Sequence, residues 1–188
     1  GKTEVALYGL AYSIGMLVQL FISGMNSALT PWMYSKIKKG DIRSMRKVLQ
    51  LLSVVVVGIA VALMLISPEL VLIFGSPKYR EAVYVIPPVA ASVFFIFIYN
   101  ILSMPQFYYE KTQFLMAASM AAAGANVVLN FIFIRLFGYI AAGYTTLACY
   151  MLYSVGHYIV SKRILVNEGI QENLMSPGFL VACSVFLI

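Results

Sequence analysis

The sequence predicts an all-α protein, a polytopic membrane helix bundle with five complete transmembrane helices and a truncated sixth. Two observations lead to this fold class. The first is composition, because 62% of the 188 residues are apolar, 11% are charged, and the mean hydropathy is +0.90. Such values are typical of membrane proteins. The second is that the charges leave several runs free, each long enough for the roughly 20 residues with which a helix crosses a bilayer.

Taken in order, these charge-free runs give the expected elements. The five complete spans cover residues 5–35, 48–68, 82–109, 112–134 and 136–161. A sixth apolar segment, 177–188, follows Ser176 and is too short to cross the hydrocarbon core. We therefore expect residues 1–188 to be a fragment of a longer membrane protein.

The charged residues predict the orientation of the spans. All seven acidic residues lie outside the charge-free runs, where a carboxylate keeps its hydration. The first loop, residues 36–47, holds six basic residues and one acid, which predicts a cytoplasmic location. Alternation then places Lys111, Lys162 and Arg163 on the same side. The net charge of +6 follows from this topology and does not require a nucleic-acid partner.

The sequence holds few groups for catalysis, and we expect a protein that is not an enzyme and binds no cofactor or metal. His157 is the single histidine, and no acid or cysteine lies near it at ligand spacing. We expect it to be a buried or interfacial hydrogen-bonding residue. Cys149 and Cys183 lie in apolar segments and are expected to act as small hydrophobic residues.

Uncharged polar residues within the spans are the candidate functional groups. An amide that faces lipid leaves its donors and acceptors unpaired, so these side chains should face another helix or a hydrated cavity. Asn126 and Asn130 are one helical turn apart and share a face. They are expected either to join helices or to line a path for a polar substrate. Asn26 and Asn100 carry the same two alternatives.

Prolines add possible breaks to the helices, because a proline inside a helix removes a backbone hydrogen bond and bends the chain. Pro87 and Pro88 fall near the outer end of the third span. Pro31 and Pro105 fall toward the inner ends of the first and third. Breaks near opposite faces suit a protein that opens alternately to either side, and also a static bundle of bent helices.

The order of several short motifs resembles a known family. A helix end reads "NSALTPWMYSKIKKGD", an outer loop reads "ELVLIFGSPKYREAVYVIPPV", and a later span reads "NVVLNFIFIRLFGYIAAG". The motif positions are Ala28 to Pro31, Gly40 and Asp41, Phe74 and Gly75, Tyr79 and Ala82, Leu129 and Asn130, and Phe137 to Gly143. Together they resemble the C-terminal half of a polysaccharide transporter, a Wzx-like O-antigen or oligosaccharide-lipid flippase. This family is part of the multidrug/oligosaccharidyl-lipid/polysaccharide exporter superfamily.

The resemblance implies a function and partners. It implies that an undecaprenyl-diphosphate-linked oligosaccharide is moved across the cytoplasmic (inner) membrane for O-antigen, lipopolysaccharide, capsule or exopolysaccharide assembly. Two lobes would rock about a central cavity, with this chain forming most of one lobe and the missing N-terminal lobe as its partner. The asparagines would exchange hydrogen bonds with sugar hydroxyls. Arg135 and His157 are the candidates for contact with the diphosphate.

Two alternatives remain open from the sequence. A multidrug efflux antiporter of the same superfamily would share the architecture, but its ion coupling favours an acid within the membrane, and the spans of this chain contain none. A membrane scaffold that moves nothing would need no hydrated interior. A cavity lined by amides favours the sugar-lipid substrate, whereas a dry and fully packed bundle favours the scaffold.

Overall fold

The computed structural model describes residues 2–75 and 77–188, and all the regular elements in these ranges are helical. In chain order they are α1 (Lys2–Lys38), α2 (Ile42–Leu65), α3 (Ser67–Phe74), the 3-10 helix η1 (Pro77–Tyr84), α4 (Ile86–Tyr108), α5 (Gln113–Phe137), α6 (Ala141–Asn167) and α7 (Pro177–Leu187).

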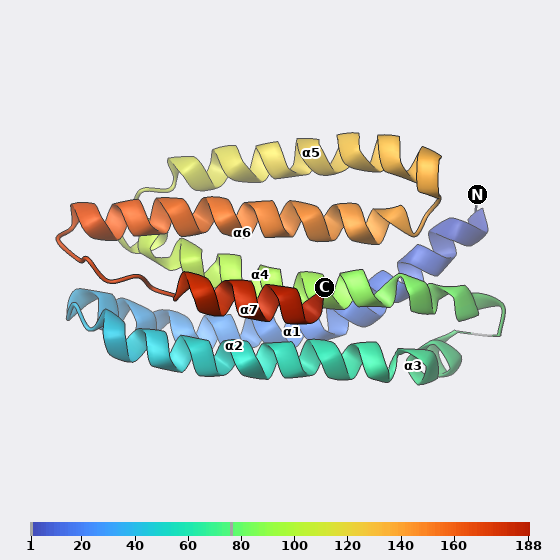
Figure 1. The fold of residues 1–188 in the computed structure, drawn as a ribbon, viewed down its shortest axis with the longest axis horizontal. Coiled ribbons are helices and arrows are strands. Elements are labelled where there is room, and N and C mark those ends of the chain that lie inside the picture. Colours follow the sequence, from blue (N-terminus) through green and yellow to red (C-terminus); the bar gives the residue numbers. More distant parts are fainter. Residues whose placement is uncertain (1, 76) are drawn as a thin grey trace.

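The long helices run roughly parallel or antiparallel to one another, and α4 occupies the centre (Figure 1). It packs against α1, α2 and α6, and most of its residues are buried. Helix α6 lies between α4 and α5, so α5 is an outer helix with no buried residue. Helix α7 packs beside α2. The core is thus built around α4, whereas α5 exposes an apolar surface suited to lipid.

The expected spans are confirmed in part. Among the described residues, four helices are long and apolar enough to cross a membrane: Thr3–Lys38, Ile42–Leu65, Tyr79–Tyr108 and Gln113–Phe137. The fifth expected run, 136–161, does form a long helix, α6, but this helix is not among the four. Its threonines, serines, tyrosines and histidine lower its hydropathy. The expected count of five complete spans is therefore not confirmed, and the segment 177–188 forms the short helix α7.

Helix boundaries depart from the charge-free runs for local reasons. Helix α5 ends at Phe137 because Gly138 adopts φ +77°, which favours glycine, so α6 begins only at Ala141. Helix α2 begins at Ile42, where Asp41 caps its first turn by accepting a hydrogen bond from the Ser44 amide. The end of the run 48–68 is broken at Ile66, where α2 stops and α3 starts.

The expectation that Pro87 and Pro88 break a helix is wrong. Both lie in the first turn of α4, where the backbone N–H groups have no intrahelical partner, so no helical hydrogen bond is lost. The chain is interrupted just before them, at α3 and η1. Pro31 and Pro105 lie inside α1 and α4, as expected.

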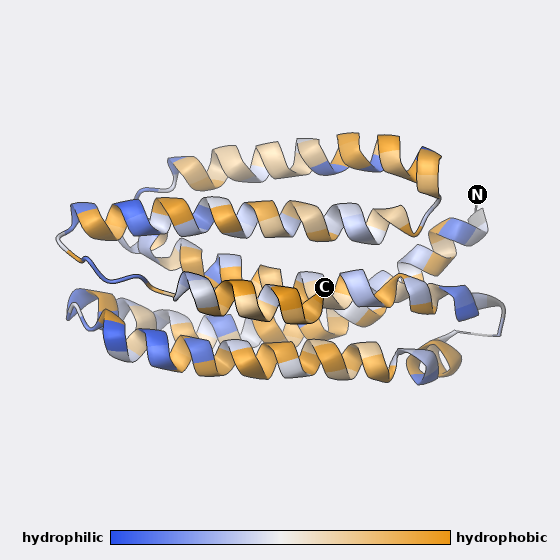
Figure 2. Cartoon of the chain, viewed as in Figure 1, coloured by the Kyte–Doolittle hydropathy of each residue, from blue (hydrophilic) through white to orange (hydrophobic). Residues whose placement is uncertain are grey.

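One end of the bundle gathers the basic loops. The α1–α2 turn, the α4–α5 turn and the α6–α7 connection lie at this end, which we call the basic end (Figure 1). Hydrophilic segments concentrate there (Figure 2). Lys111 donates to the Glu168 carboxylate at 2.9 Å, and the Arg46 Nε donates to the Asn173 carbonyl at 2.7 Å, so side chains tie the loops together. The arrangement agrees with the expected grouping of Lys111 with Lys162 and Arg163; that this end is cytoplasmic stays a prediction.

Glycines set how closely the helices approach α4. A Cβ on Gly143 would lie 2.8 Å from the Pro88 Cγ, and one on Gly15 would overlap the Val89 side chain. Small residues of this kind let membrane helices pack backbone to backbone. Gly143 thus allows α6 to approach the start of α4 closely.

We predict that Gly143→Ala destabilises the protein. The added methyl meets a proline ring that cannot move aside, and overpacking of this kind costs about 1–3 kcal/mol. The thermal midpoint of the intact protein in detergent should fall. Gly124→Ala is the control, because no heavy atom lies within 4 Å of a Cβ built there, and loss of a helical glycine is neutral or favourable. Equal midpoints for the two variants would contradict close packing at Gly143.

A second prediction concerns acid stability at the basic end. The Lys36 ammonium, which donates to Asp41, lowers the pKa of that carboxyl from 3.8 to about 2, with the Ser44 amide contributing. Because the folded pKa is depressed, the stabilising contribution is complete above pH 3.8 and is lost as the pH falls through about 2. Asp41→Asn should remove this part of the pH dependence of the thermal midpoint. An unchanged acid profile would contradict the Lys36–Asp41 contact.

Candidate functional site

A polar pocket lies where α1, α4, α5 and α6 meet. Its volume is about 450 Å³, and we call it the tyrosine pocket. Its lining carries hydroxyls, one amide and small residues, and no charged side chain; it comprises Tyr8, Tyr12, Tyr99, Ser119, Ala122, Ala123, Asn126, Thr146, Cys149, Tyr150 and Tyr153. A pocket with convergent polar groups is the natural first candidate for ligand binding.

Ring contacts between helices hold the tyrosines in place. Tyr99 of α4 stacks on Tyr150 of α6, with centroids 6.1 Å apart and planes 2° apart, and meets Tyr153 edge to face at 4.8 Å. Tyr8 and Tyr12 stack on each other along α1, at 6.0 Å. Such pairs add attraction beyond area burial. The pocket wall is thus preorganised by contacts between α4 and α6.

The hydroxyls of these tyrosines differ in whether they form hydrogen bonds with other residues. The Tyr153 hydroxyl lies 2.7 Å from the Ser119 Oγ, which joins α6 to α5. The Tyr99 hydroxyl is hydrogen-bonded to the Asn100 side chain, whereas no hydrogen bond from the Tyr150 hydroxyl reaches another described residue. The Tyr150 hydroxyl can therefore donate to and accept from a ligand.

The paired asparagines join α5 to α6. The Asn130 amide donates to the Asn126 Oδ1 at 2.9 Å, and the Thr145 hydroxyl donates to the Asn130 Oδ1. The Asn126 amide reaches the Thr146 Oγ1 at 3.4 Å. Both asparagines are half-buried. These hydrogen bonds, which we call the asparagine ladder, support the alternative that Asn130 joins two helices. Asn126 combines that role with a place in the pocket wall.

His157 lies in a separate buried cluster beside the pocket. Its Nδ1 is 2.7 Å from the Gln106 Nε2, so the histidine nitrogen accepts and Nε2 carries the proton. Its ring packs edge to face on Tyr153 at 4.4 Å and on Phe114 at 5.4 Å. The His157 Nε2, the Gln106 Oε1 and the Ser161 Oγ are buried without a partner among the described residues. The expectation of a buried hydrogen-bonding histidine is supported by this geometry.

The remaining predicted site residues lie elsewhere. Arg135 is exposed in the last turn of α5, with its Cζ 3.9 Å from the centre of the Phe131 ring, and it does not line the pocket. Asn100 is half-buried on α4 and donates to its own helix at the Ile96 carbonyl. Asn26 is buried on α1, and its Oδ1 has no partner among the described residues. The structure brings Asn126, Asn130 and His157 near the tyrosines. Arg135, Asn100 and Asn26 do not line the tyrosine pocket.

Sequence reasoning missed the tyrosines. The signal was present on α6, where Tyr150, Tyr153 and His157 follow at helical spacing and share one face. Tyr8 and Tyr12 form the same pattern on α1. What the sequence does not show is that the faces of α1, α4 and α6 meet. A lining of hydroxyls, an amide and aromatic rings can bind a polar substrate through hydrogen bonds and ring contacts.

Comparison with known proteins identifies the family. The MatE family model matches residues 1–132. The chain belongs to the MatE family. Members of this family are membrane transporters rather than enzymes, in agreement with the expectation of a protein without catalytic activity. MatE proteins are part of the superfamily expected from the motifs, whereas the Wzx-like subfamily is not confirmed.

A curated relative adds a second match. The chain is 31% identical over 120 residues to an uncharacterized membrane protein of Haemophilus influenzae. The match covers 60% of this chain and 28% of that protein, so the chain spans little more than a quarter of the length of this relative. No solved structure matches the chain.

We predict a measurable coupling between α5 and α6 through the asparagine ladder. Asn130→Ala and Thr145→Val, singly and together, form a double-mutant cycle in which the coupling energy should be about 0.6 kcal/mol and no more than about 1.7 kcal/mol. Unfolding of the intact protein in detergent gives the four free energies. Strictly additive effects would show that the ladder does not hold the two helices together.

Proposed function

We propose that this MatE chain forms one lobe of a transporter that moves a lipid-linked oligosaccharide across the cytoplasmic membrane. The tyrosine pocket is the observation that carries the proposal. It offers a free hydroxyl from Tyr150, an amide from Asn126, and aromatic walls, all without a fixed charge among its described lining residues. A sugar presents many hydroxyls and less polar ring faces, so it suits a surface that combines hydrogen-bonding groups with aromatic rings.

The pocket's neutrality limits what this lobe contributes. The diphosphate of such a lipid needs a cation, but neither Arg135 nor His157 lines the pocket. We therefore assign recognition of the sugar to this chain and contact with the diphosphate to the missing lobe or to the basic end. On this proposal the cavity is completed between two lobes, which rock about it to face either side of the membrane.

Efflux of an organic cation is the second candidate, and the same tyrosines favour it. A cation within about 6 Å of an aromatic ring is attracted to its face, so a cluster of five tyrosines suits a quaternary or protonated amine. The MatE match is equally consistent with this substrate class. The scaffold alternative has less support, because a pocket of about 450 Å³ is not a fully packed interior.

One residue distinguishes the two substrate classes. Tyr150→Phe keeps the aromatic ring and removes a hydroxyl without a protein partner, so it should impair transport of a sugar-lipid and spare that of an organic cation. Tyr150→Leu removes the ring and should impair both. The intact protein in vesicles would be offered a fluorescent undecaprenyl-diphosphate oligosaccharide or a fluorescent organic cation, and appearance on the far side would be measured.

Tyr144→Phe is the matched control, because Tyr144 lies on the same helix, is exposed, and does not line the tyrosine pocket. We expect at least a tenfold loss of sugar-lipid transport in Tyr150→Phe, the cost of about 1.4 kcal/mol for lost hydrogen bonding, and no loss in the control. Full sugar-lipid transport by both Tyr150 variants would refute the proposal. Cation transport that survives Tyr150→Phe and fails in Tyr150→Leu would establish the second candidate.

A further inference from the structure

We infer that a groove between α4, α6 and α7 binds one chain of an anionic phospholipid whose headgroup is held by Lys162 and Arg163. This inference does not rest on the proposed cargo, because the groove is separate from the tyrosine pocket and shares no lining residue with it.

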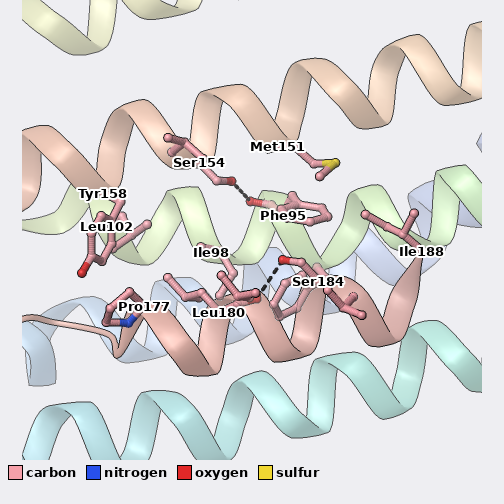
Figure 3. Close-up of a pocket in the computed structure, with 14 residues that line it drawn as sticks. Phe95, Ile98, Leu102, Met151, Ser154, Tyr158, Pro177, Leu180, Ser184 and Ile188 are labelled. Carbon is pink, nitrogen blue, oxygen red and sulfur yellow. Dashed lines mark hydrogen bonds between the residues drawn. The ribbon is translucent and has the colours of Figure 1, made fainter.

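The groove is apolar along its length and has a volume of about 660 Å³. Helix α4 forms its floor with Phe95, Ile98 and Leu102, while α6 and α7 form its two walls (Figure 3). The Ser154 and Ser184 hydroxyls donate to the backbone carbonyls of Phe95 and Leu180, and the Tyr158 hydroxyl lies at the Pro177 end of the groove. A groove whose serine hydroxyls are paired with the backbone along its length suits a hydrocarbon chain.

The groove runs along α7 toward the basic end of the bundle. Pro177 and Tyr158 lie together at one end of the groove and Ile188 at the other (Figure 3). The Pro177 end begins at the α6–α7 connection, at the basic end, so the site matches a lipid of the leaflet on that side.

One face of α6 runs from the groove to the basic side chain of Lys162. Met151, Val155 and Tyr158 line the groove, and Lys162 follows one turn after Tyr158 on the same face. Tyr158 also lines a shallow surface pocket of about 430 Å³ with Lys162 and Arg163. A lipid chain in the groove would therefore place its phosphate at these two bases.

The two bases are available for a phosphate. Both are exposed, and neither forms an ion pair with a described carboxylate. Two other bases at this end are engaged with acids, since Lys111 pairs with Glu168 and Arg46 approaches Glu172. The start of α7 adds to the attraction, because Ser176 provides no side-chain cap and leaves the first N–H groups of the helix open. Basic residues near a membrane surface attract anionic headgroups in this way.

Native mass spectrometry of the intact protein tests the headgroup site. The protein would be titrated with phosphatidylglycerol and with phosphatidylethanolamine of the same acyl chains. We expect phosphatidylglycerol to bind more tightly, and the double variant Lys162→Gln/Arg163→Gln to weaken it by about tenfold or more, because each base near a membrane surface contributes roughly 1 kcal/mol. Lys38→Gln/Lys39→Gln removes the same charge from the same end away from the groove and should leave the binding unchanged.

A second variant tests the groove itself. Val181→Trp fills it from α7 and should reduce binding of both lipids, whereas Val128→Trp, at an exposed position of α5 outside the groove, should not. Equal binding of the two lipids, or equal losses in the two charge variants, would overturn the headgroup site. A Val181→Trp variant that keeps its lipid, or that loses thermal stability without losing lipid, would show that another segment of protein fills the groove and would overturn the inference.

Discussion

The packing of neighbouring helices against α4 is the constraint on which the rest of this structure depends. Lipid gives little hydrophobic force between helices, so association relies on close van der Waals contact and on satisfied polar groups. Gly15 and Gly143 meet this requirement by bringing α1 and α6 against Val89 and Pro88 at the start of α4. Because α6 is held there, α5 can be carried on its outer side through the asparagine and threonine ladder.

The same packing creates the tyrosine pocket. Tyr99 projects from the central helix toward Tyr150 and Tyr153 of α6, and α5 closes the pocket through Ser119 and Asn126. The polar groups of α6 that lower its hydropathy therefore have a place in the bundle interior, where α4 and α5 cover them. An outer helix of this composition would face lipid with unpaired hydroxyls, which is costly. The apolar helix α5 is thus the outer one, and the more polar helix α6 lies inside the bundle.

Much of the fold follows from the sequence alone, because charge-free length is a strong signal in a membrane protein. The runs 5–35, 82–109 and 112–134 correspond to α1, α4 and α5. The break at Ile66 and the late start of α6 were not predicted, since both depend on local backbone geometry rather than on polarity. The prediction that Pro87 and Pro88 break a helix was wrong for a similar reason, because these prolines begin a helix instead of bending one.

The site was less accessible to sequence reasoning for a physical reason. An asparagine in an apolar run stands out because lipid excludes it, whereas a tyrosine is common at membrane interfaces and does not. Yet the asparagines had a partner available one turn away, and most of their hydrogen bonds are satisfied within the α5–α6 pair. The tyrosines of α1, α4 and α6 instead converge from three helices and leave the Tyr150 hydroxyl without a hydrogen-bond partner among the described residues. In a bundle of this kind, polar groups that remain free after the helices pack point to a ligand more directly than polar groups that are rare in the sequence.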